Sequence, residues 1–125
     1  MKIEEQVLSI EQMKHLKELG VDMSDASMCW VAGEDTYTDE GGWYLTIPNN
    51  FLLPYNIPTY TIGDLIEKLP IEINSHYRGI EILRNYVGAG YFIDKLCPFS
   101  FSDLSLLESL YNLLCWVAEN HKELL

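Results

Sequence analysis

The chain has 125 residues, of which 48% are hydrophobic, a size and composition typical of one domain with one core. Its 19 acidic and 8 basic residues leave a formal net charge of −11 at pH 7. A field of this sign repels phosphate groups, which argues against direct binding of nucleic acid and against binding to anionic membranes. We therefore expect a single acidic domain over residues 1–125.

A capping box predicts the first helix. Ser9 stands three residues before Gln12, and apolar residues follow at helical spacing. Gly20 fits the left-handed position that ends many helices, and Val21 is placed to contact the preceding turn. We expect a short amphipathic helix over residues 10–19.

Two strands are predicted next, over residues 27–32 and 43–47. An acidic, turn-rich connection joins them, so the pattern indicates an antiparallel hairpin. Residues 48–60 contain Pro48, Pro54 and Pro58. Because proline lacks the donor that a sheet requires, we expect this stretch to cross the surface rather than to pair as a central strand.

A second capping box, formed by Thr61 and Asp64, predicts a helix that ends before Pro70. Three stretches with β-branched or aromatic alternation follow, and they predict an antiparallel meander over residues 71–74, 79–84 and 86–93. Gly88 and Gly90 suggest a bulge or bend in the last of these strands.

The last predicted element is a helix that begins near Ser102 or Ser105 and ends near His121. Its apolar residues cover well over half of its circumference, so we expect it to lie buried between the sheet and some other part of the protein. The expected fold class is α+β, with a small antiparallel sheet of four to five strands packed by three helices.

No side chain between residues 41 and 63 carries a full charge, although 22% of the chain is charged. Prolines and asparagines in this segment argue against a membrane span. The segment either covers the core or meets a partner, because interface cores are rich in aromatic residues and poor in charge. The candidate partner contacts are Phe51, Tyr55, Trp43 and Trp116, the last of which interrupts the polar line of the C-terminal helix. Packing against the core is the alternative for all four.

The sequence contains no recognisable catalytic constellation. Cys29, Cys97 and Cys115 are isolated, as are the three histidines, and no pair has metal-ligand spacing. The segment 35–42 contains three acidic residues, but their spacing does not follow the calcium-loop pattern. The sequence also contains no nucleophile elbow and no phosphate-binding loop. We predict no catalytic residue, no metal and no cofactor. Free thiols and the lack of an apolar leader favour a cytoplasmic protein.

Three segments, LSIEQMKHLKELGVDMSDASMCW, TYTIGDLIEKLP and LYNLLCWVAENH, resemble a group of small uncharacterised proteins from prophages and mobile elements of gut anaerobic bacteria. The similarity spans most of the chain and is weakest over residues 33–55 and 75–100. It implies an α+β domain and a mobile-element context. It implies no activity, because the matching residues are caps and apolar faces.

The leading hypothesis is a non-catalytic protein-interaction module with an unknown protein partner, or a homodimer formed through the C-terminal helix. One alternative is an acidic decoy that mimics nucleic acid, which would need carboxylates arrayed on one face. Another is a small enzyme in which distant residues such as His76, Asp94 and Cys97 converge in a pocket. Binding of an unrecognised ligand also stays open.

Overall fold

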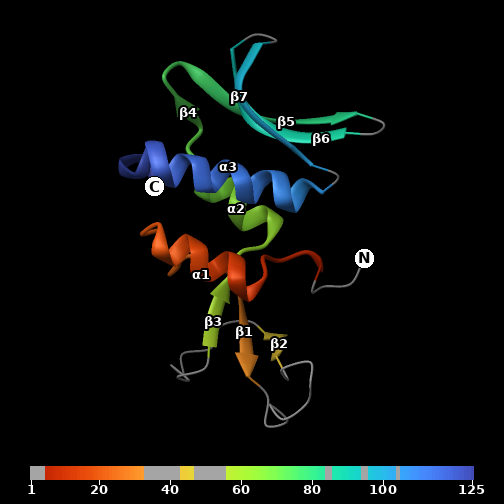
Figure 1. Ribbon diagram of the computed structural model, residues 1–125, viewed down its shortest axis with the longest axis vertical. Coiled ribbons are helices and arrows are strands. Elements are labelled where there is room, and N and C mark those ends of the chain that lie inside the picture. The colour runs from red at the N-terminus through yellow and green to blue at the C-terminus, as the bar shows by residue number, and fades with distance from the viewer. Residues whose placement is uncertain (1–4, 33–42, 47–55, 84–85, 94–95, 104) are drawn as a thin grey trace.

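The computed structural model describes residues 5–32, 43–46, 56–83, 86–93, 96–103 and 105–125. Its helices form a central layer with one antiparallel sheet at each end of the molecule (Figure 1). In chain order the elements are α1 (Ile10–Glu18), β1 (Met28–Ala32), β2 (Trp43–Thr46), β3 (Asn56–Thr59), α2 (Ile62–Lys68), β4 (Glu72–Ile73), β5 (His76–Leu83), β6 (Tyr86–Ile93), β7 (Leu96–Asp103), α3 (Leu106–Asn120) and a 3₁₀ turn (Lys122–Leu124).

The sheet nearer the N-terminus has the order β2-β1-β3, with antiparallel pairing throughout. The predicted β1–β2 hairpin is confirmed. The expectation that residues 48–60 only cross the surface was wrong for β3, which pairs with β1 and places Pro58 opposite Cys29. An edge strand needs donors on one side only, so it accommodates a proline that a central strand would not.

The second sheet has the order β4-β5-β6-β7 and is also antiparallel. Asn74 and Ser75 have φ values of 50° and 67°, which form the tight turn between β4 and β5. Of the bulge or bend predicted at Gly88 and Gly90, the bulge was wrong, because both residues pair in regular register with β5. The irregularity lies between Tyr91 and Ile93. Strand β7 was not predicted.

The helix ends follow the predicted local chemistry. Ser9 and Gln12 form a reciprocal capping box on α1, and Thr61 and Asp64 form one on α2. Ser105, the later of the two predicted starts, caps α3 by accepting a hydrogen bond from the backbone N–H of Glu108. Gly20 has φ 85° after α1, so a left-handed residue follows this helix as predicted.

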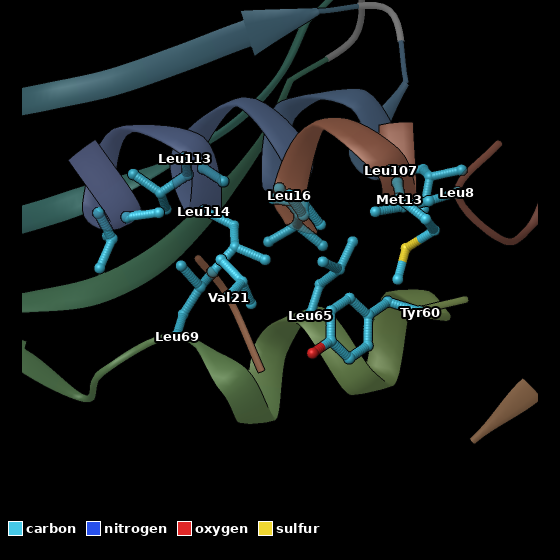
Figure 2. Close-up of a cluster of buried hydrophobic side chains, with 14 of the residues drawn as sticks. Leu8, Met13, Leu16, Val21, Tyr60, Leu65, Leu69, Leu107, Leu113 and Leu114 are labelled. Atoms are coloured by element: carbon cyan, nitrogen blue, oxygen red, sulfur yellow. The ribbon is translucent and has the colours of Figure 1, made fainter. Parts of the chain in front are cut away.

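The core lies where the three helices meet. Figure 2 shows Leu16 of α1, Leu65 of α2 and Leu114 of α3 converging in this centre, and all three are fully buried. On its other side α3 packs under β6 and β7. This confirms that the C-terminal helix is buried between a sheet and another part of the protein, which is formed by α1 and α2. The α+β class with three helices is also confirmed, although the strands divide between two sheets.

The N-terminal segment joins the helical layer to the first sheet. The backbone carbonyl of Leu8 accepts hydrogen bonds from Trp30 Nε1 at 3.0 Å and from Thr59 Oγ1 at 2.7 Å. The backbone N–H of Leu8 donates to the carbonyl of Tyr60 at 3.0 Å. Leu8 therefore ties β1 and β3 to the start of α1.

Candidate functional site

Strand β5 has a complete neighbour on one side and a short one on the other. β6 pairs with β5 from Tyr77 to Leu83. On the opposite side the last hydrogen bond runs from the backbone N–H of Arg78 to the carbonyl of Ile71, at 3.0 Å. Before Ile71 the chain comes from α2 through Pro70, so it does not continue along β5. Among the described residues, nothing pairs with residues 79–83 on this side, which we call the open edge of β5.

Strand geometry gives the direction of the unpaired groups. Backbone N–H and C=O groups alternate between the two sides of a strand, and those of Arg78 face β4. Ile80 and Ile82 therefore direct their backbone groups to the open edge, whereas Gly79 and Glu81 direct theirs to β6. Within the described part of the chain these donors and acceptors have no strand partner, so the open edge can accept a further strand.

A cavity of about 140 Å³ lies beside this edge. Its walls come from β5, α2 and α3, and the lining residues are Ile66, Leu69, Arg78, Gly79, Ile80, Leu110 and Leu113. Ile80, which lines the cavity, is 40% exposed, and Ile71, the residue before β4 that accepts the hydrogen bond from Arg78, is 66% exposed. We call this cavity, together with the open edge, the β5 cleft.

Arg78 holds one end of the β5 cleft in place. Its Nη1 donates to the backbone carbonyl oxygens of Ile66 and Leu69, the latter at 2.9 Å. These carbonyls belong to the C-terminal end of α2, where helical partners are missing. The guanidinium therefore neutralises the negative end of α2 and fixes the distance between α2 and β5.

Tyr91 braces the same junction from the neighbouring strand. It is fully buried, and its hydroxyl donates to the carbonyl of Pro70 at 2.7 Å. Burial raises the pKa of Tyr91 to about 12, although the positive charge of Arg78 opposes this shift. The tyrosine is therefore a neutral donor at physiological pH, and the turn between α2 and β4 is held from two strands.

A second cavity, of about 240 Å³, lies near the start of α2 and is lined by Gln6, Val7, Met28, Thr61, Ile62 and Gly63. Neither cavity is lined by a histidine, a cysteine or a carboxylate among the described residues. Nor does any group of three or more His, Cys, Asp or Glu in the described part of the chain suit a metal ion.

The residues considered for an enzyme are not brought together by the described structure. His76 is half-buried at the start of β5, with its Nδ1 2.9 Å from the carbonyl oxygen of Asn74. Asp94 lies outside the described residues, and Cys97 is described only by its backbone in β7. Cys29 and Cys115 are free thiols whose pKa values are raised by burial.

The described carboxylates do not gather on one face. Exposed acidic residues lie on α1, α2, β4, β5 and α3, represented by Glu11, Glu67, Glu72, Glu81 and Glu119. A nucleic-acid mimic would need such groups aligned along a single surface. The scatter gives that alternative no support within the described part of the chain.

The four predicted partner contacts do not form a described cluster. Phe51 and Tyr55 lie outside the described residues, and Trp43 is described only by its backbone, opposite Ala32 in the first sheet. Trp116 is half-buried, with its ring centroid 6.5 Å from that of Tyr91 and 5.2 Å from that of His121. A role in partner binding stays a prediction for all four.

The residues of the β5 cleft were not identified from the sequence. Of the strand predicted over residues 79–84, residues 79–83 are described and are extended as expected, but periodicity does not say which side of a strand stays unpaired.

Comparisons with protein-family models, with curated proteins and with solved structures found no match. In the part of the chain that the structure describes, no helix combines the length and the apolarity needed to cross a membrane.

Proposed function

We propose that the protein is a non-catalytic interaction module that binds a partner protein in the β5 cleft. The observation that carries this proposal is the position of an apolar cavity directly beside an unpaired strand edge. Two exposed aliphatic side chains, Ile80 at the cavity and Ile71 just before β4, add apolar surface that a partner would remove from water.

The C-terminal helix supports this role as a scaffold rather than as a dimer interface. Its wide apolar surface, which suggested a homodimer, is used within the monomer by β6 and β7 on one side and by α1 and α2 on the other. Leu110, Leu113 and Leu114 are each at most 1% exposed. The β5 cleft, by contrast, combines exposed aliphatic side chains with unpaired backbone groups.

The proposal extends to the cellular setting. A cytoplasmic location is supported by the buried free thiol of Cys29, since reducing compartments keep such groups unpaired. We also infer a mobile-element context from the resemblance of the sequence, and this context motivates a partner from the host cell or from the element itself. Both points are part of the proposal and await their own tests.

Selection with peptides displayed on phage tests the proposal. A library of random segments of about eight residues, the length of an ordinary strand, is selected on the immobilised protein. Each recovered clone is then compared on the wild type and on Ile66→Phe, which adds a ring inside the cavity. We expect clones that bind the wild type and lose about ten-fold in affinity on the variant.

Two controls make the selection decisive. Circular dichroism and thermal unfolding establish that Ile66→Phe is folded, and Glu18→Lys on α1 changes a surface residue far along the chain from the cavity walls. Clones should bind Glu18→Lys as they bind the wild type. The proposed function would be overturned if every recovered clone bound Ile66→Phe with the same affinity as the wild type.

A further inference from the structure

We propose that the partner is an extended, basic peptide segment that adds a strand to the open edge of β5 and inserts one apolar side chain into the cavity. This inference rests on the proposed function and specifies how the partner is held. Strand addition is a recurring recognition mode in which backbone hydrogen bonds provide affinity and pockets for alternate side chains provide specificity.

The backbone of β5 offers hydrogen-bonding groups to an added strand. Ile80 and Ile82 direct their N–H and C=O groups away from β6, toward the side that β4 leaves unpaired after Arg78. An antiparallel segment continuing the line of β4 would satisfy these groups. Two edge strands, β3 and β7, are less suited to strand addition, because they contain Pro58 and Pro98.

The cavity is positioned to receive one side chain of the added strand. Residues directly opposite each other on paired strands project their side chains from the same face of the sheet. The side chain of Ile80 lines the cavity, so the residue paired with Ile80 would point into the same space. A volume of about 140 Å³ suits a leucine, isoleucine, methionine or phenylalanine side chain, since a comparable engineered cavity holds benzene.

The charge of the peptide follows from the protein around the cleft. Glu81 on β5, Glu67 on α2 and Glu72 on β4 are exposed, while the guanidinium of Arg78 is bound to helix carbonyls. Residues next to the apolar anchor would project from the opposite face of the sheet, as Glu81 and Glu72 do, so lysine or arginine there would meet negative charge. A second copy of this chain is disfavoured as the occupant, because it also carries a net charge of −11.

Backbone methylation of a selected peptide tests the mode of binding without altering the protein. The probe is the synthetic form of the tightest clone that is sensitive to Ile66→Phe. We expect methylation of the peptide nitrogen facing Ile80 to weaken binding about ten-fold, since it removes a hydrogen bond and adds bulk at the edge. Methylation of the adjacent nitrogen, which faces solvent, should have little effect.

Hydrogen exchange and a charge reversal complete the test. Bound peptide should slow exchange of the backbone amides of Ile80 and Ile82. Glu81→Lys should weaken binding about three-fold or more at low salt, whereas the matched Glu18→Lys should not. The enriched clones should share one central apolar residue with lysine or arginine nearby.

Three results would overturn this inference and leave the proposed function standing. One is tolerance of methylation at both nitrogens. Another is a peptide that binds as a helix, with no slowing at Ile80 and Ile82. The third is a dimer in sedimentation whose Ile80 and Ile82 amides are already protected without peptide, which would identify the occupant as a second copy.

Discussion

The ring of Phe92 on β6 lies over the backbone of Gly79 on β5. A Cβ atom added to Gly79 would approach Phe92 Cδ2 to 2.9 Å, closer than real contacts of this kind. The two residues are diagonal neighbours, because Gly79 pairs with Gly90 and Phe92 pairs with Tyr77. The aromatic ring thus covers a strand position that has no side chain of its own.

This contact predicts a strong coupling between the two positions. Gly79→Ala should lower the free energy of unfolding by about 1–2 kcal/mol, because the ring must move or the strands must separate. In a Phe92→Ala background the same change should be neutral or stabilising by up to about 1 kcal/mol, since alanine restricts the unfolded chain. Urea denaturation of the four proteins gives the coupling energy. Equal effects in both backgrounds would contradict the contact.

The helix ends could be predicted because their determinants are local. Ser9, Thr61 and Ser105 each accept a hydrogen bond from a backbone N–H three residues later, so a short window of sequence contains both partners. The burial of α3 on two sides could also be predicted from the sequence, because its apolar residues extend well beyond a single stripe.

The missed elements depend on pairing between distant segments. Strand β7 has Phe99 and Phe101 alternating with Ser100 and Ser102, a signal of period two that was available in the sequence. Its last residues were instead considered as a helix start, because a serine there also suits an N-cap. The candidate site could not be predicted from the sequence, because the β5 cleft forms only where α2, α3 and β5 converge and β4 ends.

The hydroxyl of Tyr60 should contribute measurably to stability. Tyr60 is fully buried, and its hydroxyl donates to Asp25 Oδ1 at 2.7 Å and contacts the carbonyl oxygen of Asp22 at 2.8 Å. Tyr60→Phe keeps the ring but leaves these acceptors one donor short, so the free energy of unfolding should fall by about 1–2 kcal/mol. Chemical denaturation measures this change.

Tyr77→Phe is the matched control for that substitution. Tyr77 is 56% exposed on β5, and removal of its hydroxyl should change the free energy of unfolding by less than about 0.5 kcal/mol. Similar losses in the two variants would show that the buried hydroxyl of Tyr60 has no special structural role.

The meeting point of the helices predicts a large cost for Leu114→Ala. Leu114 has no exposed surface and packs in the central cluster, so truncation should leave a cavity and lower the free energy of unfolding by about 2–5 kcal/mol. Leu124→Ala is the control, because Leu124 is 47% exposed, and it should cost less than about 0.5 kcal/mol. A small effect at Leu114 would mean that the helical layer packs differently.

The carboxylate of Asp64 should make part of the stability depend on pH. Its Oδ2 accepts hydrogen bonds from the Ser27 hydroxyl at 2.6 Å and from the backbone N–H groups of Ser27 and Thr61, both at 3.0 Å. Partial burial opposes ionisation, but the hydrogen bonds from Ser27 and Thr61 outweigh it and hold the pKa of Asp64 below its ordinary value of 3.8.

Because the folded state lowers this pKa, the ionised carboxylate stabilises the protein above the unfolded pKa, and the contribution disappears as pH falls through the folded pKa. Asp64→Asn should therefore lower the free energy of unfolding by about 1–2 kcal/mol near neutral pH. The difference from wild type should shrink when the pH is lowered from about 5 to below about 3. Glu11→Gln, an exposed substitution on α1, should show a much smaller difference at every pH. A gap between wild type and Asp64→Asn that stays constant over this range would contradict the assignment, because only a titrating carboxylate loses its contribution on protonation.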